Sequence, residues 1–211
     1  MSQYNIDNFI YNVFNQKNDG VFLEAGASSP DDQNNTFFLE KKGWTGLLVE
    51  PLTTYNESYK KIRPNSIVEN YVLVDKSYTG NQILFGDHSH ESGATAYHTR
   101  TYQTESKPCS TLDNLLRKHA IKHIDFFSLD TEGFEHYVLH GIDFSYTTFN
   151  IILIEQHFDA YKESNFIKTP DFSYLNKHGY IQYKNNIPGS PSDHYQIFAH
   201  NTFYSSMLIP L

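Results

Sequence analysis

The chain has 211 residues, 39% of them hydrophobic and 19% charged, a balance that fits a folded globular protein and excludes a disordered one. Its net charge of −8 disfavours a nucleic-acid-binding surface, because domains that bind a duplex usually carry a basic face. The sequence has no apolar run near the roughly 20 residues that span a bilayer, no leader-like N-terminus and a single cysteine, Cys109, so we expect a cytoplasmic protein without a membrane span.

The first third of the chain alternates helical and strand patterns. In chain order we expect a helix over 5–16 within an N-terminal segment 1–18, a strand over 21–25, a helix from 36 to 43, a strand over 46–50, a helix from 51 to 63 and a strand over 66–74. Asn34, Asn35 and Thr36 offer N-caps for the second helix, and Pro51 opens the third.

Residues 75–108 interrupt this alternation. A short strand is expected over 82–85, and residues 86–104 form a polar segment rich in Ser, Thr, His and Tyr. A loop of this length inside a compact domain is usually functional or disordered, so we expect an active-site loop there. The sequence Ser110-Thr-Leu-Asp113 then resembles a capping box that opens a helix over 112–120.

The alternation resumes after that helix. The expected elements are a strand over 124–129, a helix ending at 140, a strand over 150–154, a helix near 172–178 and two late strands over 180–184 and 194–199. Strands that alternate with helices form a mainly parallel sheet, and the two late strands are close enough in sequence to form an antiparallel edge. No repeat or linker divides the chain, so we predict an α/β fold in one domain, 1–211.

Carboxylates stand at the ends of five expected strands: Glu24, Glu50, Asp75, Asp130 with Glu132, and Glu155. Ligands of open parallel sheets bind outside the carboxyl ends of the strands. Any one of these acids could instead cap the helix that follows it, but all five together favour a binding site at this edge.

The turn after the first strand, Glu24-Ala-Gly26-Ala27, has one glycine, whereas a dinucleotide fingerprint has three to make room for a pyrophosphate. The chain also lacks a P-loop lysine. A nucleoside without phosphates is therefore the better ligand. S-adenosylmethionine fits, because Glu50 can accept its ribose hydroxyls and nearby carboxylates suit its ammonium group.

Five motifs follow one another along the chain: Phe22-Leu-Glu-Ala-Gly-Ala27, Asn35-Thr-Phe-Phe-Leu-Glu-Lys-Lys-Gly-Trp-Thr-Gly-Leu-Leu-Val-Glu-Pro51, Ser110-Thr-Leu-Asp-Asn-Leu-Leu116, Ile124-Asp-Phe-Phe-Ser-Leu-Asp-Thr-Glu-Gly-Phe-Glu135 and Ile151-Ile-Leu-Ile-Glu-Gln-His157. Together they resemble the FkbM-type methyltransferases. The resemblance covers residues 21–157, and the pairing of Gly-Trp-x-Gly-x-x-x-Glu-Pro with Asp-x-Glu-Gly-x-Glu is a specific combination.

The resemblance implies a class I methyltransferase fold, with a Rossmann-like sheet and helices on both faces. It also implies S-adenosylmethionine as the methyl donor and transfer to an oxygen of a small polar acceptor, often a sugar or glycan. The cofactor-binding residues that it implies in this chain are Glu24, Gly26, Ala27, Asn35, Thr36, Glu50, Pro51, Asp75, Ser92 and Asp130.

Some of these residues have an implied place along the cofactor. Glu50 would hold the ribose, Asp75 and Ser92 would lie near the adenine, and Asp130 would lie beside the reacting methyl group. One departure concerns Ser28-Ser29-Pro30, which stands where such families usually have a second glycine. The backbone path at this point, and the amides that touch the cofactor, are therefore open questions.

Transfer to a hydroxyl also needs a group that removes its proton. The candidate catalytic residues are Asp130, Glu132, Glu155 and His157. Asp130 and Glu155 end neighbouring strands in the usual order, so we expect them to share a pocket. A divalent cation bound by their oxygens is an alternative that we do not predict. His88, His90 and His98 lack a companion cysteine and tight spacing, so they fit a substrate-covering loop better than a metal site.

Two other functions stay open on the sequence. A nicotinamide-dependent oxidoreductase uses a similar sheet, but its glycine-rich loop and hydride-relay group are not evident. A non-catalytic nucleoside-binding module would keep the fold without needing all five acids. The segment 203–211 is apolar for a tail, so it packs either on the domain or on a second subunit of a homodimer.

Overall fold

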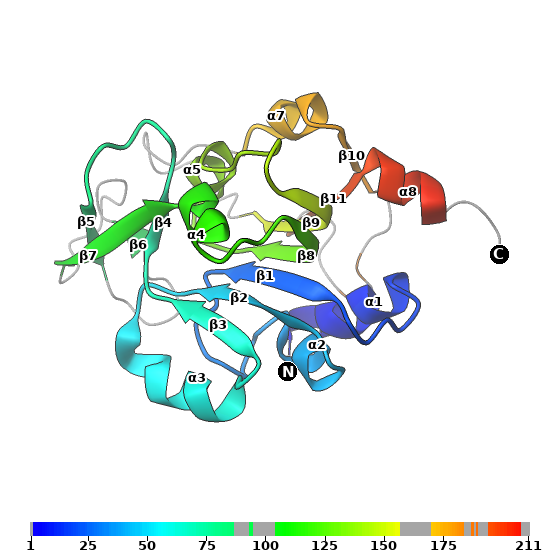
Figure 1. The fold of residues 1–211 in the computed structure, drawn as a ribbon, viewed down its shortest axis with the longest axis horizontal. Coiled ribbons are helices and arrows are strands. Elements are labelled where there is room, and N and C mark those ends of the chain that lie inside the picture. Colours follow the sequence, from blue (N-terminus) through cyan, green and yellow to red (C-terminus); the bar gives the residue numbers. More distant parts are fainter. Residues whose placement is uncertain are drawn as a thin grey trace.

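The computed structural model describes residues 2–86, 93–94, 104–156, 170–183, 187, 189 and 194–207. The main sheet of these residues is built from β1 (Val21–Ala25), β2 (Thr45–Val49), β3 (Ser66–Glu69), β8 (His123–Leu129), β9 (Thr148–Glu155), β10 (Tyr180–Gln182) and β11 (Tyr195–His200). Its seven strands lie in the order β10–β11–β9–β8–β1–β2–β3 (Figure 1).

Neighbouring strands from β9 to β3 are parallel, whereas β11 is antiparallel to both of its neighbours. The apolar runs of β1, β8 and β9 are buried on both faces, as parallel strands beneath crossover helices require. The expected α/β sheet of the class I methyltransferase type is therefore confirmed. The antiparallel strand lies one place inside the edge, because β11 is inserted between β9 and β10.

A second sheet lies beside the first, to its left in Figure 1. It contains β4 (Val72–Val74), β7 (Thr104–Thr111), β5 (Gln82–Gly86) and β6 (Gly93–Ala94), in that order. The single strand predicted over 66–74 is therefore wrong, because β3 and β4 belong to different sheets. Asn70 stabilises the break, since its Nδ2 donates to the carbonyl oxygens of Glu50 and Leu52 at 2.8 and 3.3 Å.

The polar segment predicted as a loop over 86–104 also contains regular structure. Gly93 and Ala94 form β6, which pairs with the end of β5, and Thr104 begins the eight-residue strand β7. Residues 87–92 and 95–103 lie outside the described residues, and so do the histidines and Ser92 of this segment. The predicted role of the segment in the active site stays a prediction.

Helices cover both faces of the main sheet (Figure 1). On one face lie α1 (Ile6–Val13), α2 (Phe37–Lys41), α3 (Asn56–Ile62) and α8 (Asn201–Met207), and on the other lie α4 (Leu112–Lys118), α5 (Glu135–His140) and α7 (Phe172–Lys177). The 3-10 turns η1 (Gln3–Asn5) and η2 (Thr53–Tyr55) precede α1 and α3. Trp44, expected in the core, is fully buried on the α1 face and donates Nε1 to the carbonyl of Lys17 at 2.6 Å.

Several helix boundaries differ from the predicted ones. The helix predicted over 5–16 ends at Val13, and α8 has no counterpart in the prediction. The predicted capping box is displaced by one residue, because Thr111 and not Ser110 is the N-cap of α4. Its side-chain oxygen accepts a hydrogen bond from the Asn114 amide at 3.2 Å.

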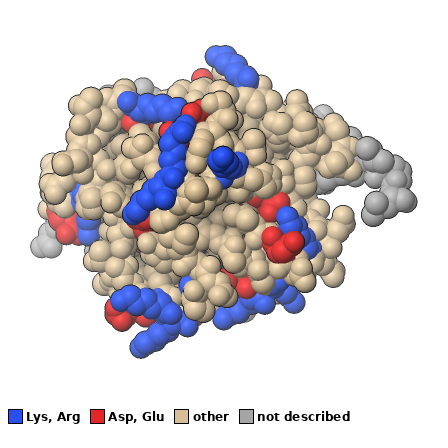
Figure 2. Space-filling view, viewed as in Figure 1, with Lys and Arg blue, Asp and Glu red and all other residues tan. Residues whose placement is uncertain are grey.

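Charged residues are dispersed on the face drawn in Figure 2. There Lys and Arg lie in small groups close to Asp and Glu, rather than in one broad basic surface. In the part of the chain that the structure describes, no helix is long and apolar enough to cross a membrane.

Candidate active site

Four of the five predicted acids lie at the carboxyl edge of adjacent strands of the main sheet. Glu24 is the last residue but one of β1, Glu50 and Asp130 directly follow β2 and β8, and Glu155 ends β9. Asp75 follows β4 and so belongs to the second sheet. The structure thus brings the acids of β9, β8, β1 and β2 to one edge of the main sheet and places Asp75 on an element of the second sheet.

The turn after β1 needs Gly26 for two reasons. Its φ of 79° is a left-handed conformation that favours glycine, and a Cβ atom at this position would lie 1.5 Å from the carbonyl oxygen of Asp130. The amides of Gly26 and Ala27 both donate to the Val49 carbonyl, at 3.0 and 3.3 Å. The glycine therefore lets the β8 strand end approach β1, and the first two amides of the turn are bonded to β2.

The structure resolves the path of the chain at Ser28-Ser29-Pro30. Ser28 adopts a left-handed conformation, with φ of 45°. Its amide donates to Oε2 of Glu50 at 2.7 Å, and its carbonyl accepts a hydrogen bond from the Tyr59 hydroxyl at 2.7 Å. A serine thus occupies the conformation that a second glycine would adopt without strain.

Glu24 turns away from solvent and holds the start of α2. Its Oε1 accepts the Asn35 amide at 2.7 Å, and its Oε2 accepts the Thr36 hydroxyl at 2.6 Å. Burial raises the pKa of this carboxyl from 4.5 to about 7, although the Arg63 charge and these hydrogen bonds act in the opposite direction. Glu24 therefore titrates near neutral pH.

The Glu50 carboxylate accepts hydrogen bonds from two backbone amides, one in the turn after β1 and one in the segment after β2. Besides the Ser28 amide at Oε2, the Leu52 amide donates to Oε1 at 2.8 Å. The side chain is buried, so these two donors fix the direction in which the carboxylate points.

Glu155 makes a cluster with His194, which directly precedes β11, and with Tyr195, the first residue of that strand. His194 Nε2 lies 2.8 Å from Oε1 of Glu155, and Tyr195 forms a side-chain hydrogen bond with the same carboxylate. Burial, followed by the charges of Glu155 and Asp130, raises the pKa of Tyr195 well above its usual range, so its phenol stays neutral. The Asp130 carboxyl is therefore close enough to belong to the same electrostatic environment.

The turn after β8 carries the second motif acid. Glu132 has a φ of 54° and is half-buried, and the next residue, Gly133, has a φ of 96°. Glu135 closes this turn, because its Oε1 accepts the amides of Thr131 and Gly133 at 2.8 and 3.2 Å. Glu135 begins α5, as expected, and its buried carboxylate lies at the positive end of that helix.

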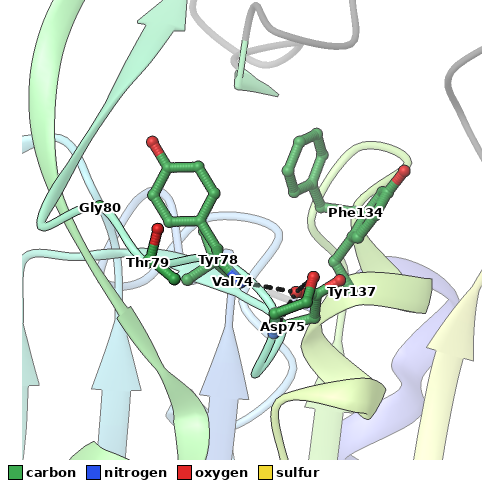
Figure 3. A pocket seen from close by; sticks show the side chains of 8 residues that line it. Val74, Asp75, Tyr78, Thr79, Gly80, Phe134 and Tyr137 are labelled. Atoms are coloured by element: carbon green, nitrogen blue, oxygen red, sulfur yellow. Dashed lines mark hydrogen bonds between the residues drawn. The ribbon is translucent and has the colours of Figure 1, made fainter.

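A pocket of about 330 Å³ opens beside Asp75, between the loop that follows β4 and α5. The rings of Tyr78 and Phe134 stand on opposite sides of it, and Asp75 lies below them in the view of Figure 3. Asp75 Oδ1 accepts the amides of Ser77 and Tyr78 at 2.8 and 3.1 Å. Leu52, two residues after Glu50, packs in the same apolar cluster as Phe134, so one wall of the pocket shares its apolar packing with the segment that follows β2.

Two predicted site residues, Ser92 and His157, lie outside the described residues. Pro51 is half-buried between Glu50 and Leu52. Among the residues that the structure describes, no group of three or more His, Cys, Asp or Glu side chains is arranged to hold a metal ion.

Four residues of this region have no counterpart in the sequence prediction: Tyr59, Arg63, His194 and Tyr195. The antiparallel register pairs Tyr195 with Glu155, so the beginning of the predicted strand 194–199 had to meet the end of the predicted strand 150–154. The sequence does not give this register, so it does not mark His194 and Tyr195 as site residues. Nothing in the sequence marks Tyr59 and Arg63, because their partners are backbone carbonyls and residues more than 20 positions away.

Solved methyltransferase structures show a distant likeness to this chain. A TehB-like S-adenosylmethionine-dependent methyltransferase from Corynebacterium glutamicum has 10% identity and a TM-score of 0.47, covering 92% of this chain and 87% of its own. Precorrin-6y C5,15-methyltransferase from Geobacter metallireducens has 10% identity and a TM-score of 0.47, covering 95% and 90%. A 1,6-didemethyltoxoflavin-N1-methyltransferase from Burkholderia thailandensis has 8% identity and a TM-score of 0.43, covering 92% and 74%.

No curated protein matches the chain at a significant level. The sequence profile of the methyltransferase FkbM domain, in contrast, matches residues 24–182. This span begins at the acid of the first strand and includes β2, β8, β9 and β10. Because the match extends over most of the chain, the protein belongs to the FkbM family of S-adenosylmethionine-dependent methyltransferases.

Proposed function

We propose that this methyltransferase transfers the methyl group to a hydroxyl of a small polar acceptor, with a sugar or glycan as the preferred class. The observation that carries the proposal is the cluster of Glu155, His194 and Tyr195 next to Asp130, at the edge of the sheet where β8 and β9 end. It combines proton-accepting and hydrogen-bonding groups, as activation of a hydroxyl requires.

The donor set at the ends of β1 and β2 fits the cofactor. Glu50 offers a fixed carboxylate for ribose hydroxyls, and Asn35 Oδ1 is a buried acceptor with no hydrogen-bond partner among the described residues. Such an acceptor suits an ammonium donor. We propose Glu50, Asn35 and Asp130 as the residues that contact the cofactor, while Glu24, Gly26 and Ala27 shape the turn and Thr36 and Pro51 flank it.

The pocket between Tyr78 and Phe134 is our proposed site for the adenine. Its aromatic walls suit a flat ring, and its position next to Leu52 would join it to the ribose at Glu50. Asp75 would contribute mainly by fixing the loop that forms one wall, because its Oδ1 is already bonded to Ser77 and Tyr78.

The bound donor supplies a methyl carbon that is already activated by its sulfonium, so the protein needs mainly to orient the acceptor and remove a proton. The Glu155–His194 pair would take the proton that the acceptor hydroxyl loses when its oxygen receives the methyl group. Glu155 orients the imidazole through Nε2, and the neutral Tyr195 phenol holds the carboxylate. Glu132 and His157 remain further candidates for contact with the acceptor.

The other functions considered on the sequence have less support. A nicotinamide-dependent oxidoreductase does not agree with membership of a methyltransferase family. A non-catalytic module would not need the ordered Glu155–His194 contact. A cytoplasmic location and a homodimer stay predictions. Residues 208–211 of the apolar tail lie outside the described residues, whereas Phe203 packs on this chain, stacked on Phe14.

The test is a screen of sugars and glycans for a methyl mass increase in the presence of S-adenosylmethionine. Glu155→Gln should lower transfer about 100-fold or more while it leaves cofactor binding intact, because it removes the group that orients the base. Glu57→Gln, at an exposed site on α3, is the matched control and should keep full activity. Methylation of amine acceptors but of no hydroxyl acceptor would overturn the proposal.

A further inference from the structure

The loop that follows β1, residues 27–36 and called here the turn loop, is held from outside by two residues at α3. Tyr59 lies within the helix and Arg63 is its C-cap, four positions further on, so both lie on the same side of it. Both are fully buried. We propose that Tyr59 and Arg63 are positioning residues for S-adenosylmethionine, which set the geometry of the turn loop in place of its missing second glycine.

This inference rests on the proposed function, in which the turn loop and Glu50 bind the cofactor. It goes further by assigning the shape of that site to a helix that need not touch the ligand. The strained residue is Ser28, because its left-handed conformation, with φ of 45°, is unfavourable for a residue other than glycine. Hydrogen bonds at both of its peptide groups hold it there, from its amide to Glu50 and from the Tyr59 hydroxyl to its carbonyl.

Arg63 fixes the remainder of the turn loop by using all three of its nitrogens. Nη1 donates to the Pro30 carbonyl at 3.1 Å and to Oδ1 of Asn34 at 2.8 Å, and Nη2 donates to the Thr36 hydroxyl at 2.8 Å. Nε is bonded to Glu40 of α2. The planar guanidinium thus sets the relative positions of two loop side chains, a loop carbonyl and the next helix, which a lysine ammonium cannot do.

Two series of hydrogen bonds, one starting at Arg63 and one at Tyr59, lead to the acids of the proposed cofactor site. Asn34, which Arg63 holds, also fixes the start of the turn loop, because its Nδ2 donates to the carbonyls of Ala27 and Ser29 at 3.2 and 3.4 Å. Thr36, which Arg63 also holds, donates its hydroxyl to the carboxylate of Glu24. Tyr59 is linked to Glu50 through Ser28, to which both are hydrogen-bonded. Burial, followed by the charges of Glu50 and Glu24, raises the pKa of the Tyr59 phenol. Displacing either α3 residue should therefore change the orientation of Glu50 and the position of Asn35.

Calorimetry with S-adenosylmethionine and with S-adenosylhomocysteine tests the inference without a known acceptor. Tyr59→Phe removes one hydroxyl and should weaken both affinities about five- to tenfold, the effect of one lost hydrogen bond. Arg63→Lys keeps the charge beside Glu40 but loses the planar set of guanidinium donors. It should weaken both affinities more than Tyr59→Phe does. It also serves as the second variant if Tyr59→Phe does not fold.

Tyr180→Phe is the matched control. The Tyr180 hydroxyl is also buried and also bonds to backbone, accepting the Phe149 amide at 3.1 Å, but it lies at the far edge of the sheet. It should lower stability by about as much as Tyr59→Phe and leave both affinities unchanged. If the two variants affect affinity equally, Tyr59 has only a structural role and the inference is wrong.

A double-mutant cycle with Ser28→Gly gives the sharper result. Glycine adopts the left-handed conformation without strain, so the loss of affinity caused by Tyr59→Phe should shrink at least about twofold when Ser28→Gly is also present. An equal loss with and without Ser28→Gly would overturn the inference. Failure of the wild-type protein to bind either ligand would instead overturn the proposed function, so the two failures are distinguishable.

Discussion

At the scale of single residues, acids of the same sheet edge differ in role because their surroundings differ. Glu50 is oriented by two amides, Glu24 is bonded to the start of α2 in a buried site, and Glu155 contacts an imidazole and a phenol. Amide donors favour a charged carboxylate, whereas burial favours a neutral one. For Glu24 burial has the larger effect and raises the pKa to about 7, so its protonation changes near neutral pH.

The raised pKa of Glu24 predicts a stability that depends on pH. Between its unfolded value of 4.5 and its folded value of about 7, the folded state keeps a proton that the unfolded state loses. The contribution of Glu24 to stability is therefore fully present below pH 4.5 and is lost as pH rises through about 7. The loss is on the order of 3 kcal/mol, from about 1.4 kcal/mol for each pH unit.

Urea unfolding of Glu24→Gln at pH 5 and pH 8 measures this contribution. The variant carries no titrating group, so its free energy of unfolding should fall less between the two pH values than that of the wild type. Glu57→Gln removes an exposed carboxylate paired with Lys60 and should keep the wild-type pH dependence. Identical pH dependence in Glu24→Gln and the wild type would refute a raised pKa.

Gly26→Ala should be among the most destabilising substitutions in the turn. The added Cβ meets the Asp130 carbonyl and also faces a left-handed backbone, so we expect a loss of about 3 kcal/mol or more. Gly189→Ala separates the two causes, because Gly189 has a φ of 86° but nothing lies within 4 Å of its Cβ position. It should lose only about 1 kcal/mol. Similar midpoints of denaturant unfolding for the two variants would show that the close approach is unimportant.

At the scale of elements, the sequence predicts the buried strands well and the exposed ones poorly. Apolar runs locate β1, β2, β8 and β9 to within about two residues, because both faces of a central parallel strand are buried. The strand β7 runs through Thr104–Thr111, whose side chains are mostly polar and largely exposed, so no periodicity marks it. Hydrophobicity therefore predicts strands that are buried beneath helices, but it does not predict an exposed strand that only pairs through its backbone.

The division of 66–74 into two strands shows a second limit. Ile67, Val68, Val72, Leu73 and Val74 read as one apolar run, whereas the chain changes sheets at Asn70, whose side chain bonds to the carbonyls of Glu50 and Leu52. The same limit applies to the candidate site. The acids at strand ends are visible in the sequence, whereas the contact of His194 with Glu155 depends on the register between β9 and β11.

At the scale of the whole molecule, ligand binding should be measurable as stabilisation. A ligand that binds only the folded state adds about 2.7 kcal/mol at 100 times its Kd. S-adenosylmethionine at that excess should therefore raise the Tm by several degrees, while NAD at the same concentration should leave it unchanged. A shift with NAD alone would contradict the assignment of the cofactor.

The position of β11 inside the sheet also has a consequence for synthesis of the protein on the ribosome. The strands β1, β2 and β8 have all emerged before β9, but β9 keeps an open edge until residues 195–200 arrive, and β10 has no other neighbour in the main sheet of the described residues. An open edge beside an apolar strand is prone to pairing with other chains. Strand β11 thus closes the open edge of β9 and brings His194 to Glu155 in the same event, so a nascent chain gains this contact and its protection from aggregation together.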